Sequence, residues 1–78
     1  MYVYLLRSKS HPAEIYVGVT PDIQGRLAEH NAGLSRHTAK FIPWELEGYL
    51  WFSNDQKGFK FERYLKSGSG RAFRNKHL

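Results

Sequence analysis

The 78-residue sequence contains no cysteine. This absence excludes a disulfide scaffold, a zinc site with cysteine ligands and a thiol nucleophile. Long apolar runs are also missing: the first run, residues 2–6, is too short for a membrane span or a signal-peptide core. The chain has no glycine-rich phosphate loop, no His-Glu-x-x-His motif and no nucleophilic-serine elbow. We therefore expect no membrane association, and the lack of cysteine favours a cytoplasmic protein.

Acidic residues are few, and they are unevenly placed. The chain has 12 Lys and Arg against 7 Asp and Glu, which gives a net charge of +5 at pH 7. Residues 57–78 hold seven basic residues and a single acid, Glu62, and so carry +6, whereas residues 1–56 carry −1. A positive charge of this kind suits a polyanionic partner such as nucleic acid.

Short runs of β-forming residues predict three strands, over residues 2–6, 15–19 and 44–52. The first two would pair as a hairpin through an eight-residue connection. In the third, Trp44, Leu46 and Gly48 would alternate with two glutamates. The chain is short and has no linker, so residues 1–78 are expected to form one domain.

Capping signals predict the helices. Thr20 would cap a helix that runs to about Asn31 before a stop at Gly33. A second helix follows the cap-like residues 53–55, with Phe61, Tyr64 and Leu65 on its buried side. We expect Gly68 and Gly70 to end it, and residues 71–76 to form a short third helix. Together these patterns indicate an α+β fold.

The first two predicted strands have faces of different character. Val3 and Val17 fall on an aliphatic face, whereas Tyr4, Tyr16 and Gly18 point the other way. The missing side chain of Gly18 would leave room for a ligand or a backbone segment to approach that face. Two strand tyrosines are most often ordinary sheet aromatics, and a tyrosine acts as a general base only with help from nearby cations or a metal-bound water.

Arg26 and His30 lie four residues apart and share one stripe of the first helix. Arg26 could pair with Asp22, and His30 could be a surface residue that caps the helix end. Alternatively, both could converge on one phosphate, which Arg binds as a bidentate donor and to which His can pass a proton. His37, in the following loop, could touch a backbone phosphate or be solvated.

Glu62 also has two interpretations. It could pair with Lys66 one helical turn later, which contributes roughly 0.2–0.5 kcal/mol. It could instead hold Mg²⁺, which is often bound by one or two carboxylates together with waters and substrate phosphates.

These residues together resemble the GIY-YIG nuclease domain. The two tyrosine motifs appear as residues 2–4 and 16–18, with Tyr2, Val3 and Val17 replacing the usual Gly and Ile. Arg26, His30, the His37-Thr38 pair with Pro43, and Glu62 within residues 62–66 follow in the family's order. The ending, residues 68–73, resembles small bacterial stand-alone members related to the nuclease domain of the excision-repair endonuclease subunit.

The resemblance implies a three-stranded antiparallel sheet flanked by helices, and hydrolysis of DNA with one Mg²⁺ or Mn²⁺ ion. It implies Tyr4 as the general base, Tyr16 as a positioning group and Glu62 as the metal ligand. Arg26 and His30 would stabilise the transition state or assist Tyr4. His37, Lys66, Arg71 and Asn75 are the candidates for substrate binding. The expected partner is DNA, which could be branched or single-stranded, and the expected process is DNA repair. A domain this small could also need a protein partner for targeting.

Two other functions compete with this nuclease. The basic segment, with its interleaved aromatic residues, could form a non-catalytic nucleic-acid-binding module. An interaction domain could instead dock a partner through Phe41, Trp44 and Trp51, if these residues formed one exposed apolar patch.

Overall fold

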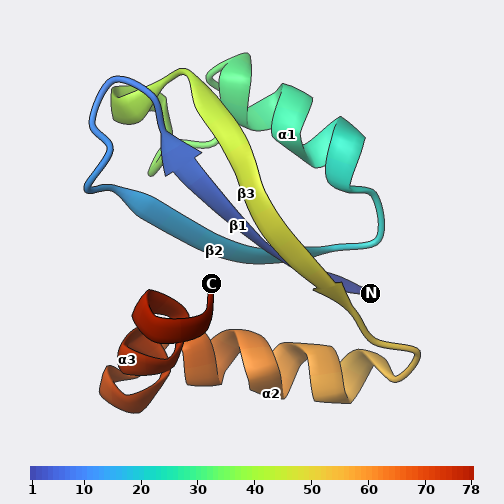
Figure 1. Ribbon diagram of the computed structural model, residues 1–78. Coiled ribbons are helices and arrows are strands. Elements are labelled where there is room, and N and C mark those ends of the chain that lie inside the picture. Colours follow the sequence, from blue (N-terminus) through green and yellow to red (C-terminus); the bar gives the residue numbers. More distant parts are fainter.

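A computed structural model describes residues 1–78 of the protein. The elements in chain order are β1 (Tyr2–Ser8), β2 (Ile15–Thr20), α1 (Ile23–Asn31), a 3₁₀ turn η1 (Ala39–Phe41), β3 (Trp44–Trp51), α2 (Asp55–Lys66) and α3 (Gly68–His77). The strands form one antiparallel sheet in the order β2-β1-β3. Helix α1 covers one face, and α2 and α3 cover the other (Figure 1). The predicted α+β class is confirmed, and no helix combines the length and apolar character that a membrane crossing needs.

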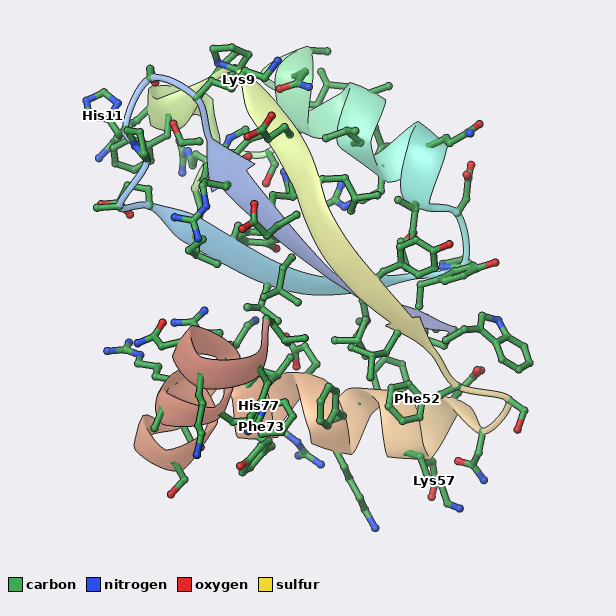
Figure 2. The ribbon with its side chains drawn as sticks, viewed as in Figure 1. Lys9, His11, Phe52, Lys57, Phe73 and His77 are labelled. Carbon is green, nitrogen blue, oxygen red and sulfur yellow. The ribbon has the colours of Figure 1, made fainter.

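The central strand β1 is buried on both faces, and each face has its own core. On the α2 face, Val3 and Leu5 pack with Val17 and Leu65. On the α1 face, the second cluster contains Tyr4, Leu6 and Trp44. This confirms the predicted separation of an aliphatic face from a tyrosine face. Figure 2 shows Phe52 pointing from the end of β3 toward α2, where its ring centroid lies 5.5 Å from that of Phe61.

The strands differ from the prediction in two details. Strand β1 continues to Ser8, so the hairpin connection is residues 9–14 instead of residues 7–14. Strand β3 contains a bulge: Leu6 pairs with Leu46, but Leu5 pairs with Gly48, which leaves Glu47 as the extra residue. A bulge reverses the alternation of side chains beyond it. Gly48 therefore lies on the face of Leu5, and the predicted alternation that grouped it with Trp44 and Leu46 is wrong.

Helix α1 begins later than predicted. Its N-cap is Asp22, whose carboxylate accepts the Gly25 amide at 3.1 Å. Thr20 instead accepts the amide of Asp22 at 3.1 Å and so braces the turn before the helix. The Asp side chain competes better for the free amides because it is charged and lies two residues closer to them. Gly33 follows the end of the helix, as predicted.

The junction between α2 and α3 also differs. Among the predicted cap-like residues 53–55, Asn54 is the one that caps α2, and it accepts the Lys57 amide at 3.1 Å. The glycines, however, do not separate the helices: Ser67 ends α2 and caps α3, and both glycines lie within α3. A Cβ atom at Gly70 would overlap the carbonyl oxygen of Tyr64, so glycine permits this close turn. The expectation that Tyr64 is buried is wrong, because it lies at the rim and is 41% exposed.

Candidate active site

Tyr4 lies in the middle of the α1 face, directly opposite Gly18 of β2. Its residue is 2% exposed. A Cβ atom at Gly18 would come 2.6 Å from the Tyr4 hydroxyl oxygen and 2.9 Å from the Tyr16 ring. The expectation that Gly18 leaves room for a ligand is therefore wrong, because the space over this glycine is filled by the two tyrosines.

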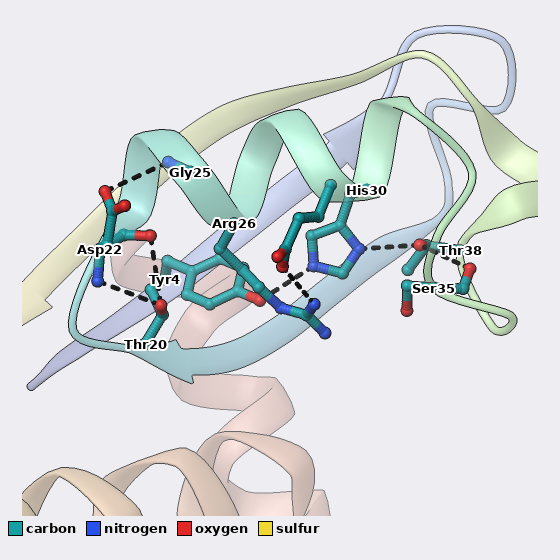
Figure 3. A network of polar contacts seen from close by, with 9 residues as sticks. Tyr4, Thr20, Asp22, Gly25, Arg26, His30, Ser35 and Thr38 are labelled. Carbon is teal, nitrogen blue, oxygen red and sulfur yellow. Dashed lines mark hydrogen bonds and ion pairs between the residues drawn. The ribbon is translucent and has the colours of Figure 1, made fainter.

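His30 lies beneath the surface of α1 and contacts Tyr4 (Figure 3). The residue is fully buried. Its Nε2 lies 2.9 Å from the Tyr4 hydroxyl, and its Nδ1 lies 2.8 Å from Oγ1 of Thr38. The alternative in which His30 caps the helix end at the surface is wrong. The helix instead turns this residue inward, so that both ring nitrogens are hydrogen-bonded.

Burial shifts the proton affinities of this pair. It lowers the pKa of His30, and the Arg26 charge lowers it further, so the imidazole is neutral near pH 7. Burial raises the pKa of Tyr4 to about 12, although the neighbouring Arg26 partly opposes this shift. A free phenolate at Tyr4 is thus disfavoured near neutral pH. Because His30 is neutral, its Nε2 can accept the Tyr4 proton at the moment Tyr4 takes one from water, and such a concerted relay avoids the free phenolate.

Arg26 lies over the Tyr4–His30 contact, where Figure 3 shows its side chain beside the Tyr4 hydroxyl. The guanidinium donates to Glu29 at 2.8 Å, and the carboxylate raises the pKa of Arg26. The alternative pairing with Asp22 is wrong, because the Asp22 carboxylate caps the helix. Arg26 is half-buried, so its cation is placed between solvent and the buried pair.

Tyr16 connects the two helical layers at the open edge of β2. Its ring centroid lies 4.9 Å from that of His30, and Nζ of Lys66 lies 5.9 Å from the ring centroid. Lys66 forms an ion pair with Glu62, as one of the two interpretations predicted. The site therefore has a buried part, Tyr4 and His30, and an edge part in which Lys66 stands between Tyr16 and Glu62.

A small hollow of about 180 Å³ lies beside Tyr16 and is lined by three cations, Lys66, Arg71 and Arg74. Burial lowers the pKa of Arg74, and the charge of Arg71 lowers it further. Like charges held together in this way are relieved when an anion binds between them. The hollow therefore has the chemistry of a phosphate site, and it includes two of the predicted substrate-binding residues.

The other two predicted substrate-binding residues lie apart from the tyrosines. His37 is exposed in the loop after α1. Asn75 lines a separate hollow with Arg7 and Glu47. The largest hollow, about 460 Å³, follows the outer surface of α2, and Glu62 is part of its lining.

The predicted apolar docking patch is not present. Trp44 is buried and donates its indole N–H to the Thr38 carbonyl at 2.8 Å. Phe41 is half-buried against it, with ring centroids 6.3 Å apart. Trp51 is exposed at the opposite end of β3. The three residues therefore do not form one exposed surface.

The sequence matches the family model described as the GIY-YIG catalytic domain over residues 1–76. The chain belongs to the GIY-YIG family. This confirms the resemblance seen in the sequence, and the matched residues include every member of the site.

Similar curated proteins are fungal. One is a structure-specific endonuclease subunit SLX1 of Debaryomyces hansenii, 38% identical over 71 residues, which covers 82% of this chain and 20% of the relative. Another, of Neosartorya fischeri, has the same printed name and is 38% identical over 82 residues, covering 86% of this chain and 20% of the relative. The chain thus spans about a fifth of the length of these relatives. No solved structure matches the chain.

Two residues of this GIY-YIG domain were not given a role by the sequence. Thr38 appeared only as part of a motif, yet it holds His30. Arg74 was one of seven cations in the basic segment, and its place beside Tyr16 depends on the angle between α2 and α3. Thr38 follows His30 by eight residues, so a contact between them was possible from the sequence. The path of the intervening loop decides whether that contact forms, and the spacing alone does not predict it.

Proposed function

We propose that this GIY-YIG domain is an endonuclease that hydrolyses phosphodiester bonds in DNA. The observation that carries the proposal is the buried contact between Tyr4 and a neutral His30, beneath a cation and beside a cationic hollow. The relatives, which are structure-specific endonuclease subunits, support it. We propose branched or single-stranded DNA as the substrate and DNA repair as the process, in keeping with structure-specific cutting by the relatives.

Tyr4 and His30 would move the proton of the attacking water. As the water oxygen bonds to phosphorus, its proton passes to the Tyr4 oxygen, and the Tyr4 proton passes to Nε2 of His30. The bond from phosphorus to the leaving oxygen of the cut strand breaks, that oxygen takes a proton from a water molecule, and His30 later returns its proton to solvent through Tyr4. Because each proton is replaced as it leaves, this relay needs no free phenolate, which a pKa of about 12 would make scarce. Tyr16, at the edge, would position the water or the phosphate.

Arg26 would bind the phosphate under attack. Its planar guanidinium can donate two parallel hydrogen bonds to phosphoryl oxygens and offset the charge that grows on them. In the free protein the Arg26 guanidinium forms an ion pair with Glu29. Binding of DNA would exchange that carboxylate for a phosphate, at little cost because the ion pair is on the surface.

Glu62 would hold one Mg²⁺ or Mn²⁺ ion. Its carboxylate offers the hard oxygen atoms that these ions prefer, and no cluster of three acidic or histidine side chains exists in the protein. One carboxylate suits an ion that keeps several waters and arrives with a phosphate. When bound, the ion would supply positive charge beside the leaving oxygen. Lys66 neutralises Glu62 in the free protein and would turn to the DNA phosphate.

Lys66 and Arg71 would bind a backbone phosphate in the hollow, together with Arg74. His37 and Asn75, the other two candidates for substrate binding, lie farther out and would contact more distant parts of the DNA strand. A domain of this size has little surface for selecting a target. We therefore also propose a protein partner, since the relatives are described as subunits.

A binding module without catalysis is the second candidate. The three cations of the hollow could hold nucleic acid without any contribution from Glu62. In that case affinity would fall steeply with salt, and no cleavage would follow.

One experiment separates the two. Purified protein is incubated with branched, single-stranded and duplex DNA, with Mg²⁺, with Mn²⁺ or with chelator. The nuclease proposal expects metal-dependent cutting that falls by about 10²-fold or more in Glu62→Gln. Glu45→Gln, an exposed change on β3, is the matched control and should cut like the wild type. Equal background cutting by wild type and Glu62→Gln, with DNA still bound by both, would leave only the binding module.

A further inference from the structure

Thr38 is a buried polar residue without a role in the proton relay of Tyr4 and His30. It is 1% exposed and lies just before η1. Its Oγ1 lies 2.8 Å from Nδ1 of His30 and donates to the Ser35 carbonyl at 3.3 Å. Its backbone carbonyl accepts the Trp44 indole N–H, and its own N–H donates to the Ser35 carbonyl at 3.2 Å. The hydroxyl is thus held by backbone contacts on both sides of the residue.

A neutral histidine carries one N–H, so the hydrogens of this chain of contacts can be counted. If Nδ1 carries it, Nδ1–H donates to Thr38, Thr38 donates to the Ser35 carbonyl, and Tyr4 donates to Nε2. Each hydrogen then has an acceptor. If Nε2 carries it, Thr38 has to donate to Nδ1 and gives up its bond to the Ser35 carbonyl. Nε2–H then donates to the Tyr4 oxygen, and the Tyr4 hydrogen is left on the side of the Arg26 guanidinium, which accepts no hydrogen bond. A buried donor without an acceptor is disfavoured.

We propose that Thr38 is a positioning residue that holds His30 as the Nδ1–H tautomer and leaves Nε2 free to take the Tyr4 proton. This inference rests on the proposed nuclease function for its consequence, but the tautomer itself does not depend on DNA. In the reaction, His30 gains the proton at Nε2 while Nδ1–H keeps its bond to Thr38. The ring is therefore already in the protonation state and orientation that the relay needs.

The test compares Thr38→Val, which keeps the shape and removes the hydroxyl, with Thr38→Ser, which keeps the hydroxyl. Proteins labelled with ¹⁵N-histidine are studied by long-range ¹H–¹⁵N NMR, which separates a protonated ring nitrogen from an unprotonated one. Wild type and Thr38→Ser should show His30 protonated at Nδ1. Thr38→Val should lose this preference and cut DNA about tenfold more slowly or worse, whereas Thr38→Ser should stay within about threefold of the wild type.

Ser8→Ala is the structural control. Ser8 is also buried, and its hydroxyl donates to the Phe41 carbonyl at 2.7 Å without touching His30. The Ser8→Ala variant should be destabilised about as much as Thr38→Val, while keeping the wild-type tautomer of His30 and the wild-type cutting rate. A wild-type His30 protonated at Nε2, or an unchanged tautomer in Thr38→Val, would overturn the inference. A wild-type protein with the expected tautomer and no cutting on any DNA would instead overturn the nuclease proposal and leave the tautomer assignment standing.

Discussion

The α1 face of the sheet buries a chain of polar contacts, whereas the α2 face buries side chains with no polar atoms to satisfy. On the first, Tyr4, His30 and Thr38 are hydrogen-bonded in series. On the second, Val3, Val17 and Leu65 form the centre of the core. Both faces belong to the same strands, because alternate residues of β1 and β2 point in opposite directions.

The difference shows how the two faces divide their roles. An aliphatic core stabilises the fold through the area that it removes from water, whereas a buried polar chain is at best neutral unless every member is paired. In this protein no buried side-chain polar atom lacks a partner. We infer that the α2 face carries most of the stability and that the α1 face carries the chemistry. Four substitutions or conditions test this division.

Tyr4→Phe should have the largest effect. It removes the hydroxyl that passes the proton, so the single-turnover cutting rate should fall by about 10²–10⁴-fold. The free energy of unfolding should fall by only about 1–3 kcal/mol, because one buried His30 nitrogen loses its partner. Tyr49→Phe is the matched control, since Tyr49 pairs with Tyr4 across the strands but is exposed. Equal cutting by both variants would remove the proposed role of Tyr4.

Leu65→Ala breaks the other face. The side chain is fully buried in the aliphatic core, so its truncation should lower the free energy of unfolding by about 2–5 kcal/mol. Cutting per folded molecule should stay within about threefold of the wild type. Urea unfolding measures the stability, and cutting rates corrected for the folded fraction measure the activity. Leu34→Ala, at a residue that is 74% exposed, should change stability by no more than about 0.5 kcal/mol. A selective loss of activity in Leu65→Ala would mean that the faces are not separable.

Gly18→Ala should disturb the polar chain from beneath. The added methyl group would meet the Tyr4 hydroxyl and the Tyr16 ring, which costs about 1–3 kcal/mol and moves Tyr4 away from His30. We expect about a tenfold loss of cutting. Gly48→Ala, in β3, places its methyl group in open space and should leave cutting unchanged. The comparison fails if both glycine variants behave alike.

The sequence was informative where structure is local. The alternation of residues in β1 and β2 predicted two faces of different character, and the predicted cap within residues 53–55 is present at Asn54. The family resemblance placed Tyr4, Arg26 and His30 in one site, and the structure brings these three together. Local periodicity and capping decide such features because they depend on a few neighbouring residues.

The sequence failed where a feature depends on packing between distant elements. The bulge at Glu47 exists because β3 has to match β1, which the sequence of β3 alone does not show. Gly70 resembles a helix breaker, but it lies inside α3 because α3 approaches the end of α2 closely. His30 resembles a surface residue until Thr38, in a separate loop, provides a partner for its second nitrogen.

The pH dependence of stability offers the finest test of the division, because it reports on His30 without changing its packing. Burial lowers the pKa of His30 in the folded state below its ordinary value of 6.5. Below pH 6.5 His30 is therefore protonated in the unfolded chain but still neutral in the folded one. The free energy of unfolding must fall as the pH falls from the unfolded-state pKa of His30 to its folded-state pKa.

Urea unfolding between pH 5 and pH 8 should show this fall in the wild type and a smaller one in His30→Gln, with parallel curves above pH 7. The cutting rate should decline over the same acidic range, since a protonated His30 cannot accept the Tyr4 proton. Because protonation would reverse the hydrogen bond to Tyr4 and place a second cation beside Arg26, both declines arise on the α1 face. Leu65→Ala should retain the acidic fall even though its whole curve lies lower. An identical fall in wild type and His30→Gln would show that the acid sensitivity lies elsewhere, and that His30 is not the buried base that the geometry indicates.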